Sequence, residues 1–223
     1  MTRASVRGGR GSVYLSRILT YRNNHPNMTM NKQRIERAKA LALRRDPDAN
    51  NFASIYDGIA ELLNHLHANN INEFHFARQT RRHFFGLTGK QNNLFFWGPP
   101  STGKTLIMKS LVELHYNYAI ITGLQPTSPF NFSSAYNRNA VFMDECKLTD
   151  NQFEQWKLLA GRQPMNTDMK YKNQHIVENC IMYTASNYEI GAYLQGNCTD
   201  AIAERTIQFN FIQKQYAYKL NPF

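Results

Sequence analysis

The clearest chemistry in the sequence lies in one loop bounded by glycines. It matches the pattern G-x-x-x-x-G-K-[ST] in full and consists of Gly98, Pro99, Pro100, Ser101, Thr102, Gly103, Lys104 and Thr105. Glycines let such a loop turn back on itself, so that its amides and the N-terminus of the next helix point at phosphates. We expect Lys104 to reach the terminal phosphates from the solvent side and the Thr105 hydroxyl to bind Mg²⁺. The loop therefore predicts a site for nucleotide phosphates and magnesium.

Two carboxylates follow a later apolar run. Residues 140–143 are apolar and end abruptly at Asp144 and Glu145. If the run is a strand of an open α/β sheet, both acids lie at its carboxyl end, where such sheets bind ligands. One carboxylate would hold the metal and the other would polarise an attacking water. We assign Asp144 to the metal and Glu145 to the water, although without the phosphate loop the pair would fit ordinary loop acids equally well.

A further polar residue, Asn187, follows the apolar run at residues 180–184. Its side chain could hydrogen-bond the γ-phosphate or orient water, where charge develops during hydrolysis. Asparagine is also common in turns, and its spacing alone leaves both interpretations open.

These residues need a scaffold that brings them together. Short apolar runs at residues 94–97, 119–121, 140–143, 180–184 and 206–211 alternate with predicted helices at 104–114 and 149–160. Such runs indicate strands buried on both faces, and the helices between them indicate crossovers between parallel strands. The sequence predicts an α/β fold in which helices cover a parallel, P-loop NTPase sheet.

The chain is expected to divide into three regions. Residues 1–28 form a basic arm, residues 29–90 a helical subdomain and residues 91–223 the nucleotide-binding domain. Within the subdomain we predict helices at 31–45, from residue 52 to about residue 69, and at 71–85. The last of these is expected to pack along a line of residues that comprises Phe74, Ala77, Arg81 and Phe85.

Charge and cysteine content limit the environment. The formal net charge is +10, and eleven of the 26 basic residues but one of the 16 acids fall within residues 1–45. A basic arm of this kind suits a phosphate backbone, while a solvated tail fits the charge equally well. Cys146, Cys180 and Cys198 form no C-x-x-C pair, so we expect a reducing, intracellular compartment. No apolar run reaches about 18 residues, which disfavours membrane insertion.

Together these motifs resemble the helicase domain of the parvovirus large non-structural replication proteins, a superfamily 3 helicase. The likeness covers roughly residues 70–212. The phosphate loop, the acids that follow residues 140–143, and Asn187 are similar to three family motifs in the same order. Residues 157–172 resemble a family-specific motif, and residues 202–205 resemble the segment that carries the family's arginine finger.

The resemblance implies a modified AAA+ sheet in a homo-oligomeric ring, which in this family is usually a hexamer, with residues 29–90 serving oligomerisation. In such a ring ATP and Mg²⁺ lie between subunits, Asn187 acts as a sensor, and Arg205 completes the ATP site of a neighbour. The resemblance also implies a β-hairpin at residues 164–177 that projects into the channel. There Lys170 and Lys172 would contact the phosphates of single-stranded DNA.

One departure from the family concerns its nicking nuclease, which carries a His-hydrophobic-His metal motif. The candidate here, His65-Leu66-His67, falls inside a predicted helix, where residues two apart point in nearly opposite directions. We therefore expect no shared metal at these histidines.

The sequence thus predicts an ATP-hydrolysing DNA helicase motor that serves viral single-stranded DNA replication in a host cell nucleus. Two alternatives stay open: a viral packaging or remodelling ATPase that does not unwind DNA, and a nucleic-acid-binding protein in which ATP is structural. ATP turnover, DNA stimulation and strand separation distinguish the three.

Overall fold

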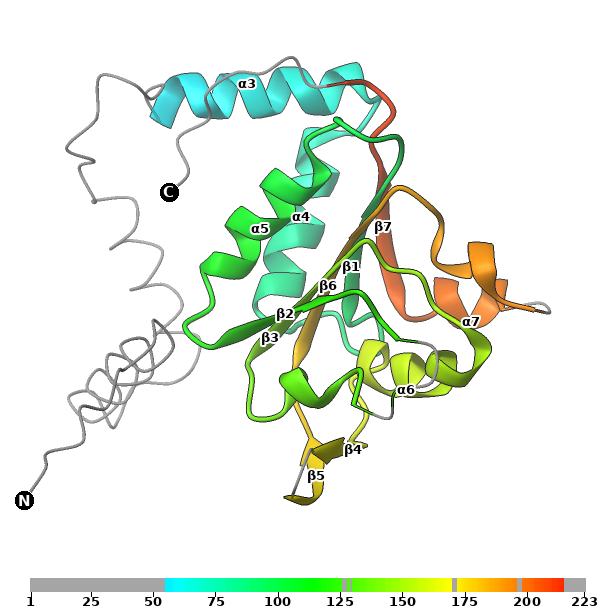
Figure 1. Ribbon diagram of the computed structural model, residues 1–223. Coiled ribbons are helices and arrows are strands. Elements are labelled where there is room, and N and C mark those ends of the chain that lie inside the picture. The colour runs from blue at the N-terminus through cyan, green and yellow to red at the C-terminus, as the bar shows by residue number, and fades with distance from the viewer. Residues whose placement is uncertain (1–54, 126–127, 129, 170–171, 196–197, 215–223) are drawn as a thin grey trace, which may run out of the picture.

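A five-stranded sheet, all of whose neighbouring strands run parallel, forms the centre of the protein (Figure 1). The computed structural model describes residues 55–214 except 126–127, 129, 170–171 and 196–197. Along the sheet the order is β2-β3-β6-β1-β7. The strands are β1 Asn93–Trp97, β2 Tyr118–Thr122, β3 Ala140–Asp144, β6 Ile181–Ser186 and β7 Thr206–Asn210. The five predicted strands are confirmed, whereas the basic arm and the helix expected at 31–45 lie outside the described residues.

Helices cover both faces of this sheet, as the predicted α/β fold requires. They are α3 Ile55–Ala68, α4 Glu73–Phe84, α5 Lys104–Glu113, α6 Asp150–Ala160 and α7 Thr199–Ala203, with 3-10 turns η2 Ser133–Ala135 and η3 Ile190–Tyr193. A separate antiparallel hairpin joins β4 Met165–Met169 to β5 Lys172–Val177. The hairpin predicted at residues 164–177 is therefore confirmed. No helix within the described ranges is long and apolar enough to cross a membrane.

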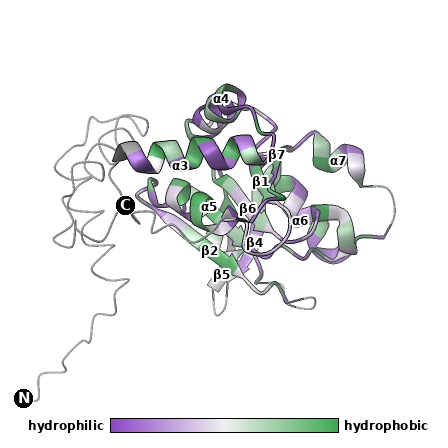
Figure 2. Ribbon diagram, turned by 90° about the horizontal axis from the view of Figure 1, so that it is seen from above, coloured by the Kyte–Doolittle hydropathy of each residue, from purple (hydrophilic) through white to green (hydrophobic). Residues whose placement is uncertain are grey.

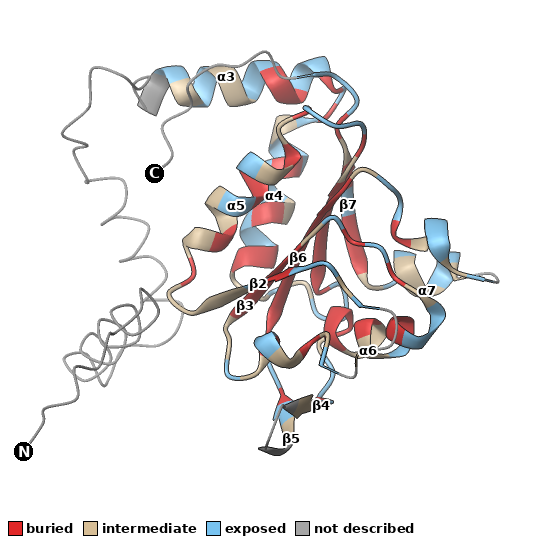
Figure 3. Ribbon diagram, in the orientation of Figure 1, coloured by how far each residue is buried: buried red, intermediate tan, exposed pale blue. Residues whose placement is uncertain are grey.

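The two faces of the sheet bury two hydrophobic clusters because side chains alternate along a strand. On β1, Leu94 and Phe96 face a cluster that includes residues of α3, α4 and α5. Phe95 faces the opposite cluster, in which Trp156 of α6 is fully buried. The central strands β1, β3 and β6 are buried along almost their whole length. The edge strand β2 is mostly part-exposed, so the prediction of burial on both faces is wrong for it, and Figure 3 shows the contrast between β6 and β2. Helices α3 and α4 thus share a core with the sheet, and their expected role in oligomerisation stays a prediction.

Helix α4 packs on a different face from the one predicted. Its buried residues are Phe76, Thr80, His83 and Phe84. On the predicted line Phe74, Ala77 and Arg81 are exposed instead, with Phe74 at 77%, and Phe85 is half-buried. A tertiary contact sets this orientation, because His83 Nε2 lies 2.9 Å from the Met182 carbonyl oxygen of β6. Apolar residues occur on both sides of α4, so periodicity alone selected the wrong face.

Helix α3 confirms the helical placement of the two histidines. Figure 2 shows hydrophobic and hydrophilic residues interleaved along this helix. His65 and Leu66 are buried, whereas the ring of His67 is exposed and lies 3.0 Å from the Glu73 carboxylate. His65 Nε2 lies 2.9 Å from the Thr102 carbonyl oxygen, so each ring has its own partner.

The strand order decides which loops meet. Because β6 lies between β1 and β3 and all three are parallel, their carboxyl ends share one edge of the sheet, here called the carboxyl edge. Trp97 of β1 pairs with Ser186, and Asp144 of β3 pairs with Ala185. The β4-β5 hairpin precedes β6 and therefore lies toward the opposite, amino edge, as Figure 1 shows.

Candidate nucleotide-binding site

The phosphate loop follows β1 at the carboxyl edge and needs its two glycines. Gly98 has a φ of +139°, and a Cβ built on it would lie 2.0 Å from the Phe211 carbonyl oxygen. Gly103 caps α5 in the left-handed region at φ 78°, with no side-chain hydrogen bond to the cap. The first amides of a helix lack intrahelical acceptors, so α5 directs donors and its positive dipole end at the loop. Such a helix start suits a phosphate group.

Lys104 lies inside the loop, and the expectation that it faces solvent is wrong. Its side chain is only 5% exposed. The ammonium group donates to the carbonyl oxygens of Gly98 at 2.8 Å and Pro99 at 2.6 Å, and to the Thr102 hydroxyl at 3.1 Å. Burial lowers the pKa of Lys104, and the carboxylates of Glu145 and Asp144 partly oppose that shift. The loop therefore holds a positive charge at its centre.

Thr105 and Asp144 form a pair of oxygen ligands. The Thr105 hydroxyl donates to Asp144 Oδ1 at 3.2 Å, which joins the start of α5 to the end of β3. Both side chains are partly exposed. A hydroxyl and a carboxylate are hard oxygen donors of the kind Mg²⁺ prefers beside a nucleotide. The two residues assigned to the metal are thus adjacent, and their donor set fits the ion.

Glu145 is held in an unusual backbone conformation. Its φ is +54°, a left-handed value that costs a non-glycine residue energy and is often found at functional sites. Its amide donates to the Ala185 carbonyl oxygen at 2.9 Å, which fixes the turn after β3. The side chain is exposed and accepts a hydrogen bond from Asn187 Nδ2 at 2.8 Å. Glu145 therefore presents a carboxylate beside the loop rather than folding it into the core.

Asn187 connects the loop to this carboxylate. Its Oδ1 accepts from the Lys104 ammonium at 3.2 Å while its Nδ2 donates to Glu145. It can do so because β6, which it follows, lies between the strands that carry the other two residues. The amide is thus positioned to respond to a group bound at Lys104 and to orient one at Glu145.

Helix α3 contributes residues that the sequence motifs did not reveal. His65 Nε2 lies 2.9 Å from the Thr102 carbonyl oxygen of the phosphate loop, and its ring stacks on Phe211 with centroids 5.5 Å apart. One turn later, Asn69 Oδ1 accepts from the amides of Ile212 at 2.6 Å and Gln213 at 2.8 Å. The signal in the sequence was slight: two polar residues beside an apolar helical stripe. The His65 contact joins α3 to the phosphate loop, and the Asn69 contacts join the end of α3 to the segment after β7.

Arg205 lies away from the phosphate loop of its own chain. It precedes β7, which runs parallel to β1, so it falls at the amino edge. Its side chain is 14% exposed and donates to the carbonyl oxygens of Ala201 at 2.9 Å and Lys157 at 3.2 Å. Glu204 lies 3.7 Å from it and also pairs with Lys90, whose ammonium lowers the pKa of that carboxyl. Within one chain Arg205 therefore binds the ends of α6 and α7.

The hairpin lysines can be located only in part. Lys170 falls outside the described residues, and Lys172 begins β5 without a described side chain. The hairpin itself rests on Tyr136, whose ring lies 4.4 Å from that of His175. In the described part of the chain, no group of three or more His, Cys, Asp or Glu residues could hold a metal. Any metal here would therefore rely on ligands such as Thr105.

The sheet order, the glycine-bounded loop and the carboxylates beside it define a P-loop NTPase fold. The computed fold is similar to JCV helicase, with a TM-score of 0.58, 14% identity, and coverage of 91% of this chain and 58% of that one. It is also similar to the C-terminal region of NrS-1, with a TM-score of 0.51 at 17% identity over 73% of this chain and 39% of that one. At these identities the likeness shows the fold.

The chain belongs to the family described as Parvovirus non-structural protein NS1, whose family model matches residues 30–215. Initiator protein NS1 of Bovine parvovirus 1 is 29% identical over 132 residues, which cover 57% of this chain and 15% of that protein. The same protein of Human parvovirus B19 is 26% identical over 134 residues, which cover 60% and 20%. The matched segment thus spans a minor part of these relatives.

Proposed function

We propose that this chain is the ATP-driven DNA helicase motor of a viral replication initiator. The observation that carries the proposal is a pair of neighbouring contact sets at one edge of the sheet. Thr105 contacts Asp144 in one set, and Asn187 joins Lys104 to Glu145 in the other. Phosphate, metal and water ligands are adjacent there. The family relation and the JCV helicase fold support the same reading.

In this proposal each residue has one task. The loop amides and Lys104 bind the β- and γ-phosphates of ATP, and Glu145 accepts the proton of an attacking water that Asn187 helps to orient. Thr105 and Asp144 would hold Mg²⁺, which supplies positive charge to the phosphates when bound. The strained backbone of Glu145 keeps its carboxylate at the surface, where water can reach it.

The proposal also includes a ring, in which Arg205 of one subunit serves the ATP of the next. In a ring, one side of each subunit contacts the opposite side of the next. This arrangement allows Arg205, which lies away from the phosphate loop of its own chain, to reach the loop of a neighbour. Arg205 would have to exchange its bonds to the Ala201 and Lys157 carbonyl oxygens for the phosphate. We propose a hexamer that grips single-stranded DNA with Lys170 and Lys172, and we propose the host nucleus as its location.

The test is ATP turnover by the purified chain with and without single-stranded DNA, followed by unwinding of a duplex with a single-stranded tail. Stimulated turnover with strand separation is expected. Stimulated turnover without separation would favour a packaging or remodelling ATPase. ATP binding without turnover would favour the nucleic-acid-binding protein, and Lys104→Ala serves as the inactive control in each assay.

A further inference from the structure

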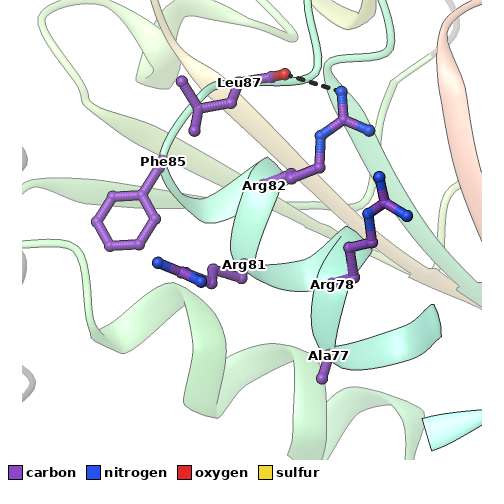
Figure 4. A pocket seen from close by; sticks show the side chains of 6 residues that line it. All are labelled: Ala77, Arg78, Arg81, Arg82, Phe85 and Leu87. Atoms are coloured by element: carbon purple, nitrogen blue, oxygen red, sulfur yellow. Dashed lines mark hydrogen bonds between the residues drawn. The ribbon is translucent and has the colours of Figure 1, made fainter. Parts of the chain in front are cut away.

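A pocket of about 480 Å³ opens on the outward side of α4, away from the nucleotide site. Figure 4 shows its lining, which comes from the middle and end of α4 and the turn after it. The lining residues are Ala77, Arg78, Arg81, Arg82, Phe85 and Leu87. Three of these are arginines, and Arg78 lies one helical turn before both Arg81 and Arg82, which makes it a surface neighbour of each.

The arginines have no acidic partner among the described residues. None of the ion pairs in that part of the chain includes Arg78, Arg81 or Arg82. Arg82 donates to the Leu87 carbonyl oxygen at 3.3 Å, as Figure 4 shows, and all three side chains are exposed. A helix C-terminus favours nearby cations and so accounts for Arg81 and Arg82, but it does not account for Arg78. Neighbouring like charges weaken a helix unless an anion binds them.

The pocket also has an apolar component. Leu87 is 62% exposed, and the half-buried ring of Phe85 lies beside Arg81 in Figure 4. An aromatic surface within a cationic groove suits single-stranded nucleic acid, because bases stack on the ring while phosphates meet the arginines. An acidic peptide would use the cations but gain less from the ring. The chemistry therefore favours a nucleic acid strand.

The pocket is connected to the hairpin at the amino edge. Arg162, shortly before β4, donates to the Gly86 carbonyl oxygen at 2.6 Å, so the pocket turn is bonded to the base of the hairpin. At the same edge His83 contacts Met182, near the point where the hairpin chain enters β6. Hydrogen bonds therefore connect the pocket on α4 to the base of the β4-β5 hairpin.

We propose that this pocket is a second contact for single-stranded DNA, outside the β4-β5 hairpin. Phosphates bind Arg78, Arg81 and Arg82, and a base lies against Phe85 and Leu87. The inference rests on the proposed function for the identity of the ligand and adds a binding surface to it.

The test measures the affinity of the full chain for a fluorescent oligo-dT over a series of KCl concentrations. Replacing Arg78, Arg81 and Arg82 together by Gln should weaken binding and reduce the logarithmic salt slope by about 0.7 per lost phosphate contact, or about 2 in all. Phe85→Leu should weaken binding by about 5- to 150-fold while leaving that slope unchanged, because it removes stacking alone. Lys109→Gln, an exposed cation on α5, is the matched control and should change neither quantity.

If the triple variant keeps a native melting temperature and its salt slope is unchanged, the proposal that this pocket binds DNA is wrong. A changed oligomer size with intact DNA binding would also overturn it and would make the face a contact between copies of the chain. ATP turnover without DNA separates this inference from the proposed function. The triple variant should retain that turnover. If the unaltered chain itself shows no turnover, the proposed function is wrong, and the result does not depend on the pocket.

Discussion

The two edges of the sheet differ in how their polar groups are satisfied. At the carboxyl edge Lys104, Asn187 and Glu145 contact one another within a few ångströms, and the ammonium group is almost fully buried. At the amino edge Arg78, Arg81 and Arg82 face solvent without described acidic partners. A site for a small ligand is pre-organised by the chain itself, whereas exposed cations favour a larger partner.

Arg205 is the residue that would join the two edges across subunits, and its replacement should have the largest effect. Arg205→Ala is expected to lower ATP turnover by about 10³- to 10⁵-fold, because an arginine finger stabilises charge in the transition state. Nucleotide affinity should change little. The ATP turnover rate and the binding of a fluorescent nucleotide measure the two effects. Arg205→Lys tests whether a positive charge alone is sufficient for turnover. Turnover at the unaltered rate would remove Arg205 from the reaction.

Glu145→Gln tests the carboxyl edge alone. Turnover is expected to fall by about 10²- to 10⁴-fold, because an amide cannot accept the proton of the attacking water. ATP binding should persist, since the loop and the pair of Thr105 and Asp144 remain. The comparison variant is Asp144→Asn, which should weaken magnesium-dependent binding. If Glu145→Gln no longer binds ATP, our division of roles between the two acids is wrong.

His65→Leu tests whether α3 positions the phosphate loop. Loss of the contact leaves the buried Thr102 carbonyl oxygen unpaired, at a cost of about 1–3 kcal/mol. If half of that cost falls on the bound loop, nucleotide affinity should drop by about 2- to 10-fold. His65→Gln, which can still donate, should restore most of the affinity, and the exposed His67→Ala should leave it unchanged. Equal losses in the Leu and Gln variants would mean that packing on Phe211, not the hydrogen bond, is what matters.

The smallest expected effect concerns pH. Burial lowers the pKa of Lys104, so its ammonium begins to lose its proton at a lower pH than an ordinary lysine. The charged form binds phosphates, and affinity for ATP should therefore decline as pH rises through that lowered pKa. Lys104→Arg keeps its charge at high pH and should lose the decline, even if its affinity is lower overall. An identical alkaline decline in both proteins would assign the effect to another group.

Local patterns predicted the carboxyl edge well because its chemistry is encoded in contiguous residues. The loop from Gly98 to Thr105 needs glycines at set positions, and the acids directly follow a buried strand. What local patterns could not give is the order of the strands. That order places β6 between β1 and β3 and so brings Asn187 against both Lys104 and Glu145.

The amino edge was less predictable because tertiary contacts decide it. His83 is polar yet buried, since it bonds a carbonyl oxygen 99 residues away, and this contact turns the arginine face of α4 outward. The link from His65 to Thr102 likewise spans 37 residues. Periodicity detects an apolar stripe but cannot identify such a partner. For the same reason it misassigned the packed face of α4 while correctly placing the helix.

Mixed rings test whether the two edges of the sheet act together across a subunit boundary. Lys104→Ala subunits lack a working loop and Arg205→Ala subunits lack the finger, so each alone should be inactive. In randomly mixed rings of equal parts, about a quarter of the interfaces combine an intact loop with an intact finger. We expect ATP turnover to recover toward that fraction once labelled subunits show that mixed rings have formed. Mixed rings as inactive as either parent would contradict the shared site.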